Sequence, residues 1–287
     1  MTSAFCPGHV SCVFQPVDSF DAMSTGSRGI GIRLNKGATA TVTPRDDSVV
    51  NIRIDGVVET AHITRMVAQI LAPGSGFEID IRNDLPVSQG FGMSAAGATA
   101  TAICIADMTG QSRADAFAAA HAAEVNGGGG LGDVAAIVAG GDVPVRTVAG
   151  MPPFGRVESA DIKMERLTLA VIGGELRTDS VLGDPVALKR IREAASTAMD
   201  AFLAEPTYDN LFAVSNGFSS ESGLESPAIR RGIERLKSRG YHAGMCMLGN
   251  SLFTDAPEGE VWALFGRGHV RTYRCSSSRK EIVIRRG

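Results

Sequence analysis

The sequence predicts an α+β fold. Runs of strand-like segments and runs of helix-like segments occur in both halves of the 287 residues, without the regular alternation of βαβ units. With 44% hydrophobic residues, the chain is long enough for one large domain or two ordinary ones. The segment Gly150-Met-Pro-Pro is a natural boundary, so we expect domains over residues 1–155 and 156–287.

The first half is expected to begin with strands. Apolar residues alternate around Pro7-Gly8, which predicts a strand, a turn and a second strand over Ser3–Pro16. Apolar side chains recur at helical spacing in Thr60–Leu71, and Pro73 ends that helix. The other elements expected before residue 82 are a glycine-rich loop within Ser24–Leu34 and strands at Ala38–Thr43, Val49–Ile54 and Phe77–Ile81.

Helices follow in the middle of the chain. Ser112 is a suitable N-cap for a helix from about Arg113 to Val125, with Asp115 in its first turn. A long amphipathic helix is expected over Pro185–Leu203, because proline is favoured at the first helical position. Further helices are expected at Ser94–Met108, Leu131–Ala139, Tyr208–Phe218 and Pro227–Arg239, and strands at Asp142–Val148, Leu167–Ile172, Ala243–Leu248, Ser251–Thr254, Val261–Phe265 and Glu281–Ile284.

The segment Leu85–Ala106, which reads LPVSQGFGMSAAGATATAICIA, is the strongest candidate for a binding loop. Glycines let the backbone turn its amides inward, and the Ala/Thr/Ile run that follows has helical composition. Free N–H groups and the positive end of the helix dipole then meet, which suits the phosphates of a nucleotide triphosphate. A tight connection without a ligand is the alternative.

Other interpretations of this segment fail on its residues. No Gly-Lys-Ser or Gly-Lys-Thr follows, so it is not a P-loop, and GFGMSAAG lacks the spacing of a dinucleotide-binding fingerprint. The continuous apolar run Ala95–Ala106 would span only about 18 Å as a helix, against about 30 Å of hydrocarbon in a bilayer. We therefore expect no membrane partner.

Composition narrows the class of protein. The chain has 28 basic and 31 acidic residues and a net charge of -3, so it lacks the electrostatic footprint of a nucleic-acid-binding protein. Basic residues near the C-terminus alternate with Val and Ile, which indicates the solvent face of terminal strands. The five cysteines are scattered and form no C-x-x-C pair, and no signal peptide is evident. A cytoplasmic protein with reduced thiols is the expectation.

Three motifs together resemble the GHMP kinases, the superfamily of galactokinase, homoserine, mevalonate and phosphomevalonate kinases. PVSQGFGMSAAGA resembles the central phosphate-binding motif, CPGHVSCVF the first motif and AGMCMLGNSLF the third, in the expected order along most of the chain. GSRGIGIRL, GLGDVAA and MLGNSLF are similar to segments of the archaeal pantoate kinases. The resemblance implies a ribosomal-protein-S5-like half, a ferredoxin-like half and an active site between them. It also implies ATP-dependent phosphorylation of pantoate to 4-phosphopantoate, in archaeal coenzyme A synthesis.

The resemblance further implies ATP and Mg²⁺ as cofactors. Ser94 matches the motif serine whose hydroxyl reaches the metal in relatives, and an ordinary helix cap is its alternative role. The residues expected to hold ATP and its phosphates are Pro86, Gly90, Phe91, Gly92, Met93, Ser94, Ala95 and Ala96.

Two acidic residues are candidates for metal binding and catalysis. In relatives a glutamate ahead of the glycine turn helps to bind Mg²⁺, which points to Glu124; a solvated helix end is the alternative. Asp133 follows the glycine run in GGGGLGDVAAI. The resemblance to mevalonate kinases implies that it accepts or orients the proton of the substrate hydroxyl, and capping the short helix is the alternative.

Pantoate is a small carboxylate, so its pocket should contain a fixed cation. Arg28 is the first choice, because a guanidinium can bind a carboxylate bidentately. Arg177 is the second choice, and a surface ion pair is the alternative for both. Ser27, beside Arg28 in a constrained glycine-rich loop, is also expected to bind the substrate. His9 stands where many superfamily members have lysine or arginine; it either contacts substrate or phosphate, or packs as a neutral residue.

Two rival functions stay open at this point. One is a GHMP kinase for another small alcohol, such as mevalonate, phosphomevalonate or homoserine. The other is a nucleotide-binding module without catalysis, which retained Asp133 and Glu124 argue against. Relatives are often homodimers, but the sequence identifies no interface.

Overall fold

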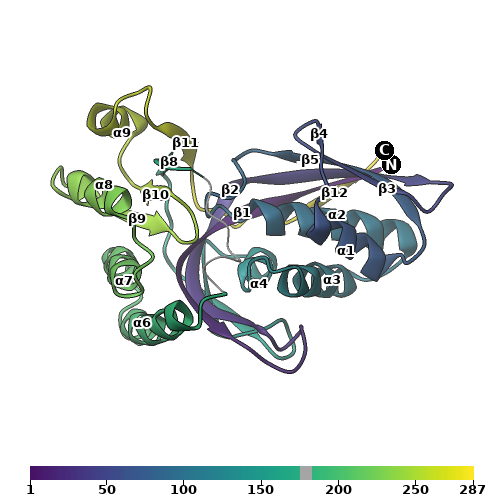
Figure 1. Cartoon of the computed structure of the whole chain (residues 1–287), viewed down its shortest axis with the longest axis horizontal. Coiled ribbons are helices and arrows are strands. Elements are labelled where there is room, and N and C mark those ends of the chain that lie inside the picture. Colours follow the sequence, from purple (N-terminus) through teal and green to yellow (C-terminus); the bar gives the residue numbers. More distant parts are fainter. Residues whose placement is uncertain (175–182) are drawn as a thin grey trace.

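Two β-sheets, each with helices packed against it, make up the computed structural model, which describes residues 1–174 and 183–287 (Figure 1). The α+β fold is therefore confirmed. The first sheet runs in the order β12-β1-β2-β5-β3-β4, and β6 pairs with both β2 and β7. Only β3 and β5 are parallel among its pairs. Its strands are β1 (Thr2–Val17), β2 (Gly26–Arg45), β3 (Val50–Ile54), β4 (Val57–Val58), β5 (Gly76–Asn83), β6 (Val143–Val148), β7 (Arg156–Ala160) and β12 (Val283–Arg286).

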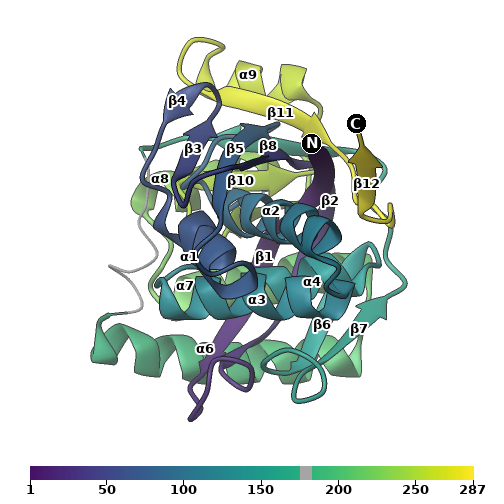
Figure 2. The same cartoon turned by 90° about the vertical axis from the view of Figure 1, so that its right-hand side faces the viewer.

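Four helices cover one face of this sheet (Figure 2): α1 (His62–Leu71), α2 (Met93–Thr109), α3 (Arg113–Asn126) and α4 (Asp133–Ala139). The central one, α2, packs on β1 and β2 and is flanked by α1 and α3. Small side chains let it approach these neighbours closely, and every residue from Met93 to Ala106 except Ser94 is buried. The exposed Ser94 thus lies at the start of an otherwise enclosed helix.

The second sheet is antiparallel and runs in the order β11-β8-β10-β9. Helices α7 and α8 pack on β9, α8 also contacts β10, and α9 lies against β11. The long helix α6 packs on α7 and on β1 of the first sheet. The elements of this part are β8 (Leu167–Val171), α6 (Pro185–Ala204), α7 (Tyr208–Glu221), α8 (Pro227–Lys237), β9 (Ala243–Cys246), β10 (Ser251–Thr254), α9 (Glu258–Phe265) and β11 (Arg271–Cys275).

The expected turn at Pro7-Gly8 and the expected loop within Ser24–Leu34 are both wrong. Each segment belongs to one continuous strand, β1 or β2, and the two strands pair along their length. A register shift between Pro7 and His9 absorbs the irregularity at the proline without reversing the chain. The glycines serve close packing rather than turning, because a Cβ at Gly37 would lie 1.9 Å from the carbonyl oxygen of Cys6.

The strand expected at Val261–Phe265 is also wrong, since these residues end helix α9. Pro257 precedes the helix, and Glu258 and Glu260 lie in its first turn, where the helix dipole favours negative charge. The short apolar run could not by itself distinguish a strand from a buried helix. By contrast, the cap at Ser112 is confirmed, with a full capping box to Asp115.

The end of the chain returns to the first sheet, where β12 pairs with β1 and the two termini lie side by side (Figure 1). β7 joins the same sheet through β6. Residues from beyond position 155 therefore extend the sheet of the first half, and the division into 1–155 and 156–287 stays a prediction. Within the described ranges, no helix has the length and apolar character needed to cross a membrane.

Candidate active site

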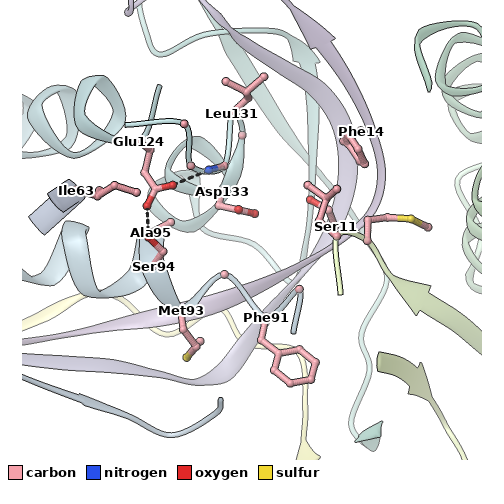
Figure 3. A pocket seen from close by; sticks show the side chains of 18 of the residues that line it. Ser11, Phe14, Ile63, Phe91, Met93, Ser94, Ala95, Glu124, Leu131 and Asp133 are labelled. Atoms are coloured by element: carbon pink, nitrogen blue, oxygen red, sulfur yellow. Dashed lines mark hydrogen bonds between the residues drawn. The ribbon is translucent and has the colours of Figure 1, made fainter. Parts of the chain in front are cut away.

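A cavity of about 350 Å³ lies where the loop before α2 meets the glycine-rich turn before α4 (Figure 3). The loop between β9 and β10 closes one side through Met247 and Leu248. The cavity is therefore lined by residues from the part of the chain that forms the first sheet and by residues from the part that forms the second. Of the residues predicted for the site, those that line it are Ser27, Gly90, Phe91, Gly92, Met93, Ser94, Ala95, Glu124 and Asp133.

The loop before α2 has the backbone conformation that its glycines allow. Gly90 and Gly92 have φ values of 74° and 68°, in the left-handed region that other residues rarely adopt. Gly92 is the N-cap, and no side chain caps the first turn of α2, so its N–H groups remain available to an anion. The N–H of Ala96 is not available to an anion, because it donates to the carbonyl oxygen of Gly92 at 3.0 Å. Of the residues expected to hold ATP, Ala96 and Pro86 do not line the cavity.

Ser94 and Glu124 form a polar pair on the cavity wall. The Ser94 hydroxyl donates to Oε1 of Glu124 at 2.7 Å, and the Gly130 N–H donates to Oε2 at 2.6 Å. Glu124 is fully buried, so it is not a solvated helix-end residue. Burial raises the pKa of Glu124 to about 7, although both hydrogen bonds act in the opposite direction. Ser94 is the second residue of α2 rather than its cap.

Asp133 opens α4 and points into the cavity (Figure 3). Its side chain makes no capping hydrogen bond to the helix; instead its Oδ1 lies 2.7 Å from Nδ1 of His9. Burial alone would raise the pKa of Asp133. The hydrogen bond from His9 and the nearby charge of Arg146 outweigh this, so the pKa lies below its ordinary value. The carboxyl is therefore ionised at neutral pH.

His9 lies behind the cavity wall rather than on it. The side chain is fully buried, and burial lowers the pKa of the imidazole, so it is neutral at pH 7. Its Nε2 lies 3.4 Å from Nη1 of Arg146. His9 is thus a neutral, buried histidine whose ring contacts the side chains of Asp133 and Arg146, and a contact with substrate or phosphate stays a prediction.

Arg28, the first choice for binding the substrate carboxylate, is held by contacts away from the cavity. Arg28 donates from Nε to the Thr147 carbonyl oxygen and from Nη1 to Oε1 of Gln15, both at 3.1 Å, and does not line the cavity. Arg177 lies outside the described residues. Ser27, in contrast, lines the cavity.

The sequence analysis missed Arg146, a buried arginine in strand β6 that is only 1% exposed. Its Nε donates to the carbonyl oxygen of Ser27 at 3.2 Å. Among the described residues, its Nη2 finds no hydrogen-bond partner. A Cβ on Gly132, which lines the cavity, would lie 2.6 Å from Nε, so the guanidinium lies directly behind the wall. An arginine within the mostly apolar strand VPVRTV was the available signal.

Several further cavity residues were not predicted individually, although all but His62 and Ile63 lie within the motifs quoted above. Most are apolar or small and reach the site only through tertiary packing: Ser11, Phe14, His62, Ile63, Leu131, Met247 and Leu248. No group of three or more metal-ligating side chains gathers anywhere in the part of the chain that the structure describes.

The chain is similar in sequence to proteins of known function. Residues 57–141 match the GHMP kinases N terminal domain. The chain is 31% identical over 262 residues to a pantoate kinase of Thermococcus kodakarensis, covering 87% of this chain and 86% of the relative. It is 29% identical over 256 residues to a pantoate kinase of Methanocaldococcus jannaschii, covering 87% and 90%.

Solved structures show the same fold. A phosphotransferase related to the CoA biosynthesis pathway superposes with a TM-score of 0.89 at 26% identity, over 99% of this chain and 98% of the other. A homoserine kinase from Cytophaga hutchinsonii superposes with a TM-score of 0.70 at 16% identity, over 99% and 97%. The second likeness concerns the fold alone, and it confirms the expected GHMP kinase architecture. From the identity to the first relative and its extent, the chain belongs to the pantoate kinase family of the GHMP kinases.

Proposed function

We propose that this protein transfers the γ-phosphoryl group of ATP to the 4-hydroxyl of pantoate, giving 4-phosphopantoate for coenzyme A synthesis. The similarity to pantoate kinases along most of the chain supports the substrate. The observation that carries the reaction is the shared cavity. It holds the uncapped start of α2, the buried carboxyl of Glu124 and the ionised carboxylate of Asp133.

The loop before α2 would hold the phosphates of ATP. Phosphoryl transfer requires positioning and neutralisation of phosphate charge more than covalent chemistry. The free N–H groups at the first turn of α2 supply oriented donors for the phosphate oxygens. Gly90, Gly92 and Met93 line the cavity beside these donors, as this role requires.

Ser94 and Glu124 fit a hard divalent cation such as Mg²⁺. The pKa of Glu124 near 7 indicates a buried carboxyl that lacks a compensating positive charge. Mg²⁺ in kinases is commonly held by one or two protein oxygens together with phosphates and water, so a complete protein cage is not needed. When bound, the ion would neutralise charge on the phosphates. Ser94 and Glu124 would orient it through the hydroxyl and carboxylate that they already bring within 2.7 Å of each other.

Asp133 would orient the attacking hydroxyl of the substrate. Because its pKa is lowered, the Asp133 carboxylate is a weak base. It can accept a hydrogen bond from the substrate hydroxyl, but it would take up the proton only late in the phosphoryl transfer. In a loose transition state the attacking hydroxyl forms little bond to phosphorus, so it needs little deprotonation. A weak base such as Asp133 therefore suffices.

The carboxylate of pantoate would lie toward Ser27 and Arg146. The guanidinium of Arg146 lies behind the wall formed by Gly132, and its Nη2 has no hydrogen-bond partner among the described residues. Arg28 remains a second candidate, but its donors are engaged by Gln15 and Thr147.

The proposal is tested by ADP release from purified protein with ATP, Mg²⁺ and D-pantoate, with mevalonate and homoserine as control acceptors. We expect release that depends on pantoate. Asp133→Asn should retain ATP affinity and lower kcat by about 10²–10⁴-fold, the range for a lost acid–base group. Activity with a control acceptor alone would reject pantoate as the substrate, whereas ATP binding without release on any acceptor would indicate a nucleotide-binding module.

A further inference from the structure

His9 connects the phosphate-binding loop to the carboxylate of Asp133. Its backbone N–H donates to the carbonyl oxygen of Phe91, in the loop before α2, at 3.0 Å. Its side-chain Nδ1 lies 2.7 Å from Oδ1 of Asp133, across 124 positions of sequence. Under the proposed function these two ends hold the donor phosphate and the acceptor hydroxyl. His9 therefore connects the loop before α2 to Asp133, and phosphoryl transfer depends on the distance between the groups that these two would hold.

The neighbours of His9 select one tautomer of its ring. Arg146 has only donors, so Nε2, 3.4 Å from its Nη1, must be the unprotonated nitrogen. Asp133 is ionised and can only accept, so Nδ1 must carry the proton. Both contacts require the same neutral form, with Nδ1–H donating to Asp133.

Glycines clear the space that this arrangement needs. A Cβ at Gly31 of β2 would lie 2.0 Å from Nε2 of His9 and 2.5 Å from the Val10 carbonyl oxygen. One at Gly29 would lie 2.5 Å from Nη2 of Arg146 and 2.3 Å from the Val13 carbonyl oxygen. On the far side, a Cβ at Gly132 would lie 2.6 Å from Nε of the same guanidinium. Any side chain at these three positions would displace the ring or the guanidinium. The register shift of β1 next to His9 adds a local irregularity of the kind that re-aims a side chain near a site.

We propose that His9 is a positioning residue: its Nδ1–H holds Oδ1 of Asp133 and leaves Oδ2 free for the hydroxyl of the substrate. This inference rests on the proposed phosphoryl transfer. Within residues 1–174 and 183–287, Oδ2 of Asp133 accepts no hydrogen bond, and the side chain keeps 23% of its surface exposed toward the cavity. His9 does not line the cavity, so it acts on the substrate only through Asp133. Arg146 fixes the tautomer from behind.

The test compares two substitutions that each imitate one nitrogen of the ring. In His9→Asn the side-chain amide occupies the place of Nδ1 and can still donate to Asp133, whereas in His9→Gln it occupies the place of Nε2. If His9 positions Asp133, His9→Gln should lower kcat by about 10- to 100-fold, with both KM values within about twofold of wild type. His9→Asn should keep kcat within about threefold. If His9 only fills space, His9→Gln should keep a higher kcat than His9→Asn, because glutamine is closer to histidine in volume.

A second measurement does not depend on activity. Long-range ¹H–¹⁵N NMR spectra distinguish a protonated from an unprotonated imidazole nitrogen, and the spectrum of His9→Asn identifies the signals of His9. We expect Nδ1 protonated and Nε2 bare. An Nε2–H form, or a rate for His9→Gln equal to that of wild type, would overturn the proposal.

The controls separate this proposal from the proposed function. Gly31→Ala offers a third variant, which crowds the ring and the Val10 carbonyl oxygen while removing no polar group. Thermal unfolding checks that all three variants remain folded. Gly31→Ala should lower kcat in the same way as His9→Gln. If the wild-type protein turns over no pantoate, the substrate assignment fails, and the NMR measurement still decides whether His9 donates to Asp133.

Discussion

Glu124 is a carboxyl that the ligand-free fold disfavours in its ionised form. It is fully buried, and desolvation raises its pKa from 4.5 to about 7 despite the hydrogen bonds from Ser94 and Gly130. A structural carboxyl would be expected to have a cationic partner. The negative charge of Asp133 raises the pKa of Glu124 further. Ionising Glu124 therefore costs stability in the ligand-free protein, and the proposed cation would offset that cost.

Replacing Glu124 should expose that cost. The folded protein holds the Glu124 proton more tightly than the unfolded chain, so the free energy of unfolding of wild type falls as pH rises through about 5 to 7. The full effect is at most ~3 kcal/mol. Glu124→Gln has no proton to lose, so its stability advantage over wild type should grow from pH 5 to pH 8. Urea unfolding at both pH values measures it, and an equal difference at both would contradict the raised pKa.

The two candidate cations for the substrate carboxylate can be separated by matched substitutions. Arg146→Lys keeps the charge but loses the planar fork, so we expect KM for pantoate to rise by about 10-fold or more while KM for ATP stays within about twofold. Arg28→Lys should leave both nearly unchanged, because its guanidinium contacts Gln15 and Thr147 outside the cavity. Steady-state kinetics decide; the reverse pattern would return the role to Arg28.

At the scale of elements, the loop between β9 and β10 is pressed against the loop before α2. A Cβ at Gly249 would lie 2.2 Å from the carbonyl oxygen of Gln89, and one at Gly90 would lie 2.6 Å from that of Met247. The Ser251 hydroxyl donates to the same Gln89 oxygen at 2.6 Å. Gly249 of the third sequence motif therefore allows the backbone of the β9–β10 loop to contact the backbone of the loop before α2.

Adding one methyl group at this contact should impair the kinase. In Gly249→Ala the phosphate-binding loop must shift, and a displacement of about 1 Å can cost on the order of 10²-fold in rate. We expect kcat/KM for ATP to fall by about 10- to 100-fold. Gly259→Ala is the matched control, because a Cβ there meets nothing within 4 Å. Equal kinetics for the two variants would show that the contact does not position the loop.

At the scale of the whole molecule, the C-terminal segment of the chain packs against the first half. Arg33 of β2 is 2% exposed and donates from Nη1 to the Ser278 carbonyl oxygen at 2.7 Å and from Nη2 to that of Lys280 at 2.5 Å. Its Nε donates to the carbonyl oxygen of Ile137. Without the C-terminal segment, a buried guanidinium would lose two of its acceptors, which is strongly destabilising.

We therefore expect the two halves to unfold in one transition. Trp262 is the only tryptophan and lies in α9, beside the second sheet, so its fluorescence reports on that part, whereas far-UV circular dichroism reports on all helices. The two signals should give the same urea midpoint. A fragment ending at residue 155 should not fold. Two separate midpoints would show that the halves are independent domains.

Local rules in the sequence determined much of this protein. The α+β class, the capping box at Ser112, the helix over Pro185–Ala204 and the glycine loop before α2 follow from interactions within a few residues. Motif order gave the GHMP kinase fold. The same reasoning failed at Pro7-Gly8 and within Ser24–Leu34, where glycines permit close approach of distant backbones instead of turns.

Only the tertiary structure decided which side chains meet. His9, Asp133 and Arg146 lie on β1, α4 and β6, more than 120 positions separate the first two, and no local pattern specifies their contacts. Burial, which sets the pKa values of Glu124 and His9, is likewise a property of the packed fold. The sequence thus determined the glycine-rich loop before α2, because the positive φ values of Gly90 and Gly92 are a local property. Tertiary packing decided the arrangement around His9, Asp133 and Arg146, because desolvation and contacts between distant side chains are not local properties of the sequence.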